Sequence, residues 1–194
     1  MKNTIQKIII LSIIIQFFSC VKNDEPTPPT IVYVEENPVK SYLAASGFSV
    51  LSSQTSITKF EKGFSFIPKV TGNVSQLVFK FPVNIEGFKY TIWDRATGLE
   101  LIENFISKND NDIEKTENIN EFKLIKGKEY SLTVNTKNYT KYSKPDNSDA
   151  VFPINTPNFT ITNSCSSMSS GTYPTTIYKD AYFGECGFIF KQTQ

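Results

Sequence analysis

The fold is decided by V-S-Q-L-V-F-K-F-P (residues 74–82) and, after a polar break, G-F-K-Y-T-I-W-D-R-A-T-G-L-E-L (87–101). Both runs largely alternate apolar and polar side chains, which is the pattern of a half-buried β-strand. The segment D-R-A-T-G (94–98) is typical of a turn, because Asp accepts backbone N–H bonds and Gly adopts a positive φ. The two runs therefore predict consecutive strands of an antiparallel sheet.

Similar short aromatic or β-branched runs recur at residues 47–51, 63–67, 129–136 and 187–190, bounded by Gly, Pro, Ser or Asn. The chain holds 16 Phe and 9 Tyr, a composition that favours sheet over helix. Only residues 38–45 suggest a helical turn or two. We therefore predict an all-β fold, an antiparallel β-sandwich of the jelly-roll kind, formed as a single domain by residues 31–194.

The first 19 residues have the pattern of an export signal. Two lysines precede an apolar run at residues 8–18, which would form a helix only about 16 Å long, too short to span a bilayer comfortably. Ser19-Cys20 resembles the lipobox of bacterial lipoproteins, which implies that Cys20 is lipidated and becomes the first residue. The alternative is a plain secretory signal with Cys20 unused.

Residues 20–30 would follow as the lipidated cysteine and a disordered tether, because prolines and charges keep this segment extended and solvated. The prediction is a protein anchored by lipid to the outer membrane, facing either the cell surface or the periplasm. The run K-N-D-E (22–25) resembles an acidic tag for the outer face, although an ordinary polar linker explains it equally well.

Four segments in order resemble a family of bacterial extracellular jelly-roll domains of unknown function. They are G-N-V-S-Q-L-V-F (72–79), Y-T-I-W-D-R-A-T-G-L-E-L-I (90–102), F-K-L-I-K-G-K-E-Y-S-L-T-V (122–134) and G-F-I-F-K (187–191). Domains of this family occur in surface lipoproteins and beside glycan-active enzymes. The resemblance implies a fold and a compartment, and it supplies no catalytic residues.

With Cys20 lipidated, Cys165 and Cys186 remain as an even pair in an oxidising compartment. We expect a disulfide between them, which would stabilise the fold by about 3 kcal/mol. The alternative is two buried free thiols.

Several kinds of chemistry are excluded by composition. The absence of histidine removes Ser-His-Asp and Cys-His nucleophiles and His-containing zinc sites. The formal charge of +1, with no basic stripe, argues against a nucleic-acid partner. A carboxylate pair acting on a glycoside stays possible, with no pair singled out among Asp94, Glu100, Glu103, Asp180 and Glu185.

Two segments suggest binding. In D-N-D-I-E, the acids Asp110, Asp112 and Glu114 lie two apart, as calcium ligands often do, although a polar hairpin tip explains them equally well. The second segment is the predicted loop at residues 137–147. Its candidate ligand-binding residues are Tyr139, Lys141, Tyr142 and Asp146.

Exposed tyrosines beside hydrogen-bonding groups suit sugar rings, which have apolar faces and polar edges. A second aromatic group is expected at the same end of the domain: Tyr173, Tyr178, Tyr182 and Phe183. The alternative is that most of these rings cover the core, with their hydroxyls in water.

These observations favour a non-catalytic module that binds glycan or another extracellular ligand. Two alternatives stay open: a structural or adhesive surface component that contacts other proteins, and a small carboxylate-dependent glycoside hydrolase.

Overall fold

A computed structural model describes residue 33 and residues 35–193, except for 111, 112 and 185. The predicted signal peptide, Cys20 and the tether therefore lie outside the described residues. Within the described part, no helix has the length and apolar character needed to cross a membrane.

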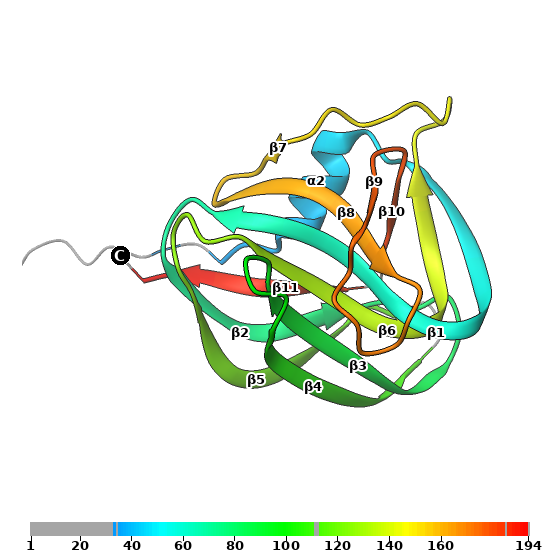
Figure 1. The fold of residues 1–194 in the computed structure, drawn as a ribbon, viewed down its shortest axis with the longest axis horizontal. Coiled ribbons are helices and arrows are strands. Elements are labelled where there is room, and N and C mark those ends of the chain that lie inside the picture. Colours follow the sequence, from blue (N-terminus) through cyan, green and yellow to red (C-terminus); the bar gives the residue numbers. More distant parts are fainter. Residues whose placement is uncertain (1–32, 34, 111–112, 185, 194) are drawn as a thin grey trace, which may run out of the picture. The chain divides into compact units, whose positions relative to one another are not determined.

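The described chain is almost entirely β-structure (Figure 1). Its elements, in order, are the helix α2 (Pro38–Ser46) and the strands β1 (Val50–Pro68), β2 (Gly72–Phe79), β3 (Ile85–Asp94), β4 (Glu100–Asn109), β5 (Lys115–Leu124), β6 (Tyr130–Ser143), β7 (Ile154–Asn155), β8 (Phe159–Ser167), β9 (Thr176–Tyr178), β10 (Ala181–Phe183) and β11 (Cys186–Gln192).

The strands form two antiparallel sheets. The larger sheet has the order β4-β3-β6-β1-β8-β7, with β10 added to β6 and β9 added to β8. The smaller sheet has the order β11-β2-β5. The predicted all-β antiparallel sandwich is confirmed, and its strands divide unequally between the two sheets.

Aromatic side chains fill the space between the sheets. Phe64 and Phe66 of β1 are fully buried, and the rings of Phe66 and Phe188 of β11 are 5.2 Å apart. Phe79 of β2 meets Phe88 of β3 at 5.3 Å, which joins the sheets at another point. The period-two alternation of the sequence thus buries one face of each sheet against the other.

The predicted turn between β3 and β4 is present. The backbone N–H of Ala96 donates to Asp94 Oδ1 at 2.9 Å, and that of Gly98 donates to the Asp94 carbonyl oxygen at 2.8 Å. Gly98 has a φ of 69°, a conformation that glycine adopts without steric cost.

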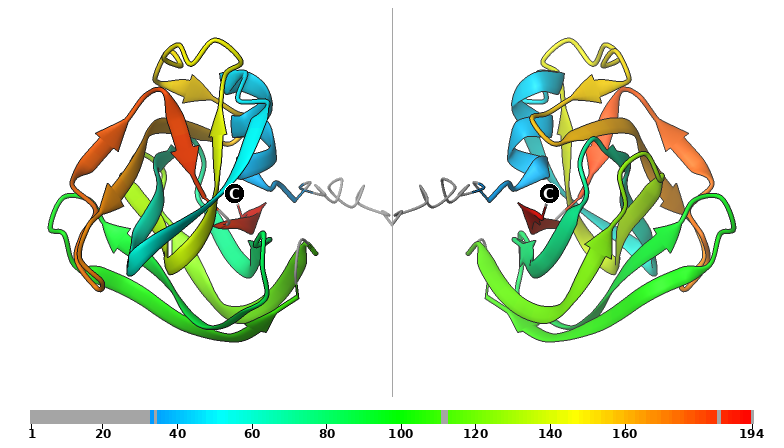
Figure 2. Two further views of the ribbon diagram at one scale, coloured as in Figure 1. Left: turned by 90° about the vertical axis from the view of Figure 1, so that its right-hand side faces the viewer. Right: turned by 90° about the vertical axis from the view of Figure 1, so that its left-hand side faces the viewer.

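The helix predicted at residues 38–45 is also present, as α2. Asn37 caps its first turn by accepting the N–H of Val39 at 3.1 Å, and Gly47 ends it with a φ of 75°. Tyr42 is fully buried and its hydroxyl lies 2.7 Å from Ser164 Oγ on β8. The helix lies beside β11, so it covers one end of the core (Figure 2).

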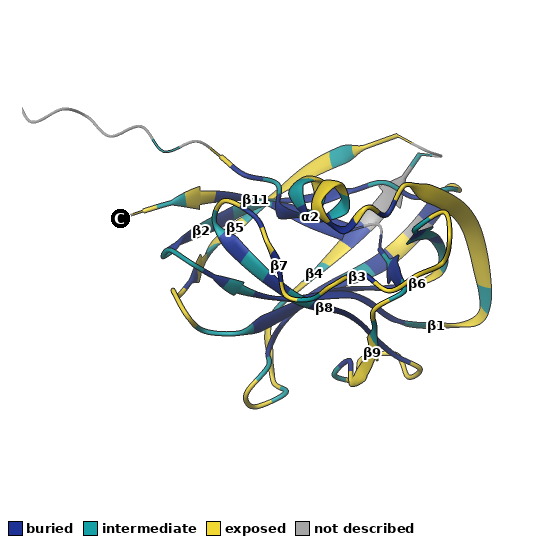
Figure 3. Cartoon of the chain, turned by 90° about the horizontal axis from the view of Figure 1, so that it is seen from above, coloured by how far each residue is buried: buried dark blue, intermediate teal, exposed yellow. Residues whose placement is uncertain are grey.

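Two strands are longer than the sequence suggested. β1 begins within the predicted run 47–51 and continues through 63–67, although residues 52–59 between them are mostly polar and exposed (Figure 3). β6 continues to Ser143, so the predicted loop 137–147 is mostly strand. The reason is backbone pairing: Val50 to Thr55 of β1 pair with Ser143 to Asn138 of β6, which needs no apolar alternation.

The expected disulfide is not formed, so that prediction was wrong. Cys165 and Cys186 are both buried free cysteines. They belong to different sheets, Cys165 on β8 and Cys186 on β11. Cys165 Sγ lies 3.7 Å from Ser65 Oγ, whereas Cys186 Sγ lies 3.9 Å from the backbone oxygen of Lys62. An even count of thiols in one compartment does not bring their sulfur atoms together, because each strand's register decides where a thiol points.

Candidate functional site

A cavity of about 110 Å³ opens at the end of the larger sheet where β6, β9 and β10 meet. Aromatic side chains dominate its wall. The lining residues are Phe60, Lys62, Tyr139, Ser166, Met168, Tyr178 and Phe183, and we call this cavity the aromatic pocket.

Four rings form a continuous chain of edge-to-face contacts around the pocket. Phe60 and Tyr139 are 6.1 Å apart, Tyr139 and Phe183 are 5.9 Å apart, and Phe183 and Tyr178 are 4.6 Å apart. The rings come from β1, β6, β10 and β9 respectively. Edge-to-face packing is a favourable arrangement of aromatic pairs, so these contacts stabilise the pocket wall.

Strand pairing explains why the distant aromatic residues meet. β9 pairs with β8, bringing Tyr178 opposite Ser164, and β10 pairs with β6, bringing Phe183 opposite Lys141. The Ser166 hydroxyl donates to the Tyr178 hydroxyl at 3.2 Å. The chain thus crosses from the β8 side of the pocket to the β6 side between β9 and β10.

Lys62 is the charged residue of the pocket. The residue is only 1% exposed, and its Nζ donates to the backbone oxygen of Thr136 at 3.0 Å. Nζ lies 3.1 Å from the ring centroid of Phe60 and 4.1 Å from that of Tyr139, so two aromatic faces contact the amine. None of the described residues forms an ion pair with it.

Burial lowers the pKa of Lys62 to about 7, against a smaller opposing effect of the charge on Glu61. A lysine with this pKa loses its proton near neutral pH, whereas an exposed lysine stays protonated there. The pocket therefore contains a group that can be either a cation or a neutral amine under physiological conditions.

Lys62 lies just after an irregularity in the pairing of β1 with β6. Thr55 pairs with Asn138 and Phe60 pairs with Thr136, so four residues of β1 lie opposite a single residue of β6. Such a bulge interrupts the ladder and bends the strand. The Thr136 carbonyl at the edge of the bulge accepts the Lys62 amine.

Glu61, next to Lys62, is fully buried and holds the neighbouring loop. Its carboxylate accepts Thr133 Oγ1 at 2.7 Å, Asn135 Nδ2 at 2.8 Å and the backbone N–H of Gly171 at 3.0 Å. Gly171 belongs to the connection between β8 and β9, which carries Met168 of the pocket wall. Glu61 thus fastens this connection to the sheet.

The structure separates the four predicted ligand-binding residues. Tyr139 lines the aromatic pocket. Tyr142 lies three residues further along β6, so it points to the other face of the strand, where its ring is 5.8 Å from that of Tyr182. Lys141 pairs in register with Phe183, and Asp146 accepts the N–H of Ser148 at 3.0 Å within a turn.

The second aromatic group divides in the same way. Tyr178 and Phe183 line the pocket with Tyr139, as expected from the sequence. Tyr182 is fully buried in the core, and Tyr173 packs against Trp93 at 5.9 Å.

Sequence reasoning missed Phe60 and Lys62. In F-E-K-G-F-S-F (60–66), Phe60, Lys62, Phe64 and Phe66 occur at alternate positions. Alternate residues of a strand share one face, so a lysine spaced in this way among phenylalanines was the signal that could have identified Lys62 as buried.

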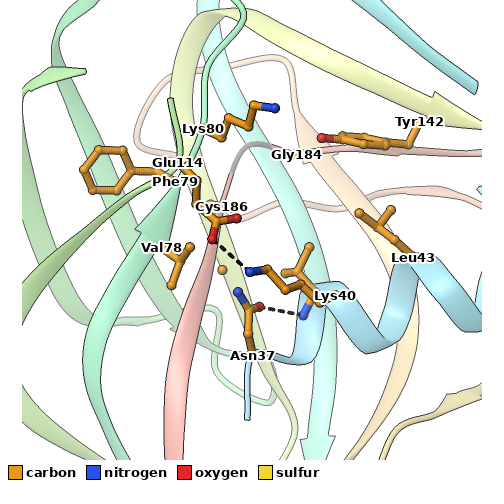
Figure 4. Close-up of a pocket in the computed structure, with 12 residues that line it drawn as sticks. Asn37, Lys40, Leu43, Val78, Phe79, Lys80, Glu114, Tyr142, Gly184 and Cys186 are labelled. Carbon is orange, nitrogen blue, oxygen red and sulfur yellow. Dashed lines mark hydrogen bonds and ion pairs between the residues drawn. The ribbon is translucent and has the colours of Figure 1, made fainter. Parts of the chain in front are cut away.

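Tyr142 lines a second cavity, of about 90 Å³, between α2, β2 and β11 (Figure 4). Its charged residues include Lys40 and Glu114, which form an ion pair at 2.9 Å. Lys80 also lines this cavity, and its wall lacks the group of aromatic rings that surrounds the aromatic pocket.

The predicted calcium ligands are engaged with lysines where they are described. Asp110 Oδ2 lies 2.6 Å from Lys115 Nζ, and Glu114 pairs with Lys40. Asp112 lies outside the described residues. Among those described, no group of three or more His, Cys, Asp or Glu could hold a metal. The calcium site stays a prediction.

Three of the candidate catalytic carboxylates, Asp94, Glu100 and Glu103, also pair with cations. Lys89 contacts Glu100 at 3.0 Å and Glu103 at 2.6 Å, and Lys128 contacts Asp94 at 2.8 Å. The hydrogen bond from Lys89 lowers the pKa of Glu103, and that from Lys128 lowers the pKa of Asp94. A general acid for glycoside hydrolysis requires the opposite shift. Glu185 lies outside the described residues.

No protein-family model matches the chain, and no curated protein matches it. The resemblance to extracellular jelly-roll domains stays a prediction from the motifs.

Proposed function

We propose that this protein is a non-catalytic binding module, and that the aromatic pocket receives one sugar unit of an extracellular glycan. The observation that carries the proposal is the open cavity walled by Tyr139, Tyr178 and Phe183 from three different strands. Sugar rings have apolar faces that pack on aromatic rings and hydroxyls that need polar partners. A cavity of about 110 Å³ suits a single small unit better than a long polymer segment.

The polar groups of the pocket support the same assignment. The residues of its wall include the polar side chains Ser166, Tyr139, Tyr178 and Lys62, of which Ser166 donates to Tyr178 and Lys62 donates to Thr136. A small number of fixed polar groups among apolar ones is the usual composition of a site that orients a ligand. Catalysis is not part of the proposal, because two of the candidate catalytic carboxylates, Asp94 and Glu103, have lowered pKa values and pair with Lys128 and Lys89.

We further propose that the module is attached to the outer membrane through a lipid on Cys20, with residues 20–30 as its tether. The support is the apolar leader followed by Ser19-Cys20. Metabolic labelling with a fatty acid in the native host should label the protein, whereas the Cys20→Ser variant should carry no label. Labelling of both proteins, or of neither, contradicts the anchor.

The binding proposal is tested with the purified full-length protein on an array of bacterial, plant and host polysaccharides. We expect one glycan class to bind, and we expect Tyr139→Ala and Phe183→Ala each to weaken that binding by about tenfold or more. Phe105→Ala is the matched control, because Phe105 is 70% exposed on β4 and lies outside the pocket lining.

Circular dichroism of each variant would check that the sheet is retained. Equal binding by wild type and both pocket variants would assign the glycan to another surface. Absence of binding to every polysaccharide on the array would contradict the proposed function.

A second function, adhesion to another surface protein, is favoured by the apolar side chains of β4. Leu101 and Phe105 of β4, and Leu99 immediately before it, are exposed by 37%, 70% and 64%. β4 ends the larger sheet, and an exposed apolar strand at a sheet edge is a common place for pairing with another chain. If this function is correct, Phe105→Lys should abolish cross-links to the protein's neighbours on intact cells.

A further inference from the structure

Among the described lysines, Lys62 is the one that is buried, and its partners differ from those of Lys89, Lys115 and Lys128. Lys89, Lys115 and Lys128 each have a carboxylate partner, and each is more exposed than Lys62. Lys62 is buried and has one hydrogen-bond acceptor, the Thr136 carbonyl oxygen. A buried ammonium group without a compensating anion is costly, so an anion that entered the pocket would be favoured by its charge.

The amine also retains donors for such an anion. An ammonium group has three N–H bonds, and Thr136 accepts one of them. The rings of Phe60 and Tyr139 contact Nζ but offer no lone pair of comparable strength. A carboxylate at the pocket floor would therefore gain a charge-assisted hydrogen bond that a sugar hydroxyl cannot match.

Glu61 compensates the charge of Lys62 only in part, because its effect on the pKa of Lys62 is smaller than that of burial. Its two carboxylate oxygens already accept three hydrogen bonds, from Thr133, Asn135 and Gly171. The three donors hold it on the side that faces the β8–β9 connection, and it does not line the pocket.

We propose that the ligand of the aromatic pocket is an acidic saccharide, a uronic acid unit whose carboxylate binds the Lys62 amine while its ring packs on Tyr139 and Phe183. This inference rests on the proposed function and specifies its ligand class. A neutral sugar could use the same aromatic wall, but it would leave the charge of Lys62 without a counter-ion.

Binding should therefore be linked to the protonation of Lys62. Its pKa of about 7 leaves much of the amine neutral at slightly alkaline pH, and a bound carboxylate would raise that pKa by favouring the cation. The other titratable groups around it are Glu61 on the same strand, Tyr139 on β6, Tyr178 on β9 and Cys186 on β11. Burial raises the pKa of Tyr139, so this phenol stays neutral in the same range.

The test is calorimetric titration of the full-length protein with an oligogalacturonide and with the matching neutral galacto-oligosaccharide, at about pH 6.5 and about pH 8.5. We expect the acidic sugar to bind about tenfold more tightly than the neutral one at the lower pH, and this preference to shrink at the higher pH. Lys62→Met should remove the preference, so that the acidic and the neutral sugar bind with similar affinity at both pH values. Lys137→Met, which removes an exposed lysine on β6, is the control and should keep the preference.

A measurement on the wild type alone guards against misfolding of the variant. In buffers of different ionisation enthalpy, binding of the acidic sugar at about pH 8 should take up a fraction of a proton, and binding of the neutral sugar should take up none. Equal affinity for both sugars would overturn the inference and leave the proposed function standing. Binding of neither sugar would count against both, and preferential binding of peptides through their terminal carboxylate would replace the saccharide by a protein ligand.

Discussion

The amine of Lys62 on β1 lies 4.1 Å from the centroid of the Tyr139 ring on β6. The two residues are brought together by the register of the β1–β6 ladder and by the bulge that interrupts it after Thr55. The buried amine thus lies against the aromatic wall of the pocket. Both the stability of the protein and the proposed binding should therefore depend on whether the Lys62 amine is protonated.

Replacing Lys62 by methionine should remove a pH dependence of stability. The pKa of Lys62 in the folded protein is about 7, below the ordinary value of 10.5, so between these values the unfolded chain binds a proton that the folded protein does not. The free energy of unfolding of the wild type should therefore rise with pH in this window. We expect the wild type to gain about 1 to 2 kcal/mol over Lys62→Met between pH 7 and 9.

Urea unfolding of both proteins at each pH gives this difference, in which the contributions of all other titrating groups cancel. Lys137→Met should follow the wild type. A constant difference between the wild type and Lys62→Met would show that Lys62 titrates normally.

Glu61→Gln should loosen the connection between β8 and β9. The amide keeps the shape of the side chain but loses the negative charge and directs an NH₂ group at donors that now bind a carboxylate. We expect a loss of about 2 kcal/mol in the free energy of unfolding and faster proteolysis near Gly171. Glu121→Gln is the matched control, since Glu121 is exposed, and its stability should stay close to that of the wild type.

Gly63→Ala should be far more damaging than Gly127→Ala. A Cβ on Gly63 would overlap the backbone carbonyl of Leu132, because β1 is flanked there by both β6 and β8. We expect a loss of about 3 kcal/mol or no folded protein. Gly127 has a φ of 77° and open space around it, so alanine there should cost about 1 kcal/mol. Thermal melts compare the two, and similar melting temperatures would refute the packing at Gly63.

The two buried thiols should stay reduced and unreactive in the folded protein. Burial raises the pKa of Cys165 to about 12, which keeps it a thiol, and Cys186 is also buried. With the Cys20→Ser variant, a thiol reagent at about pH 8 should label neither cysteine before denaturation and both after it. A mass that rises by two hydrogens on reduction would show instead that a disulfide had formed.

Local patterns predicted the elements that depend on neighbouring residues. The alternation of Phe88, Tyr90 and Ile92 decides which face of β3 is buried, and all three are in the core. The turn at Asp94–Gly98 depends on one carboxylate and one glycine, and α2 depends on Asn37 and Gly47 at its ends. The sequence could predict these features because each depends on interactions between residues a few positions apart.

The sequence by itself determined an all-β sandwich, its aromatic core and the position of its helix, because alternation and capping act between residues a few positions apart. The tertiary structure alone decided that Tyr139 packs against Phe183 while Tyr142 packs against Tyr182 on the other face of β6. It also decided that Cys165 and Cys186 form no disulfide. It also decided that Lys62 lies under two rings. Such contacts follow from strand register and from a bulge, and a shift of one residue would turn each of these side chains to the opposite face.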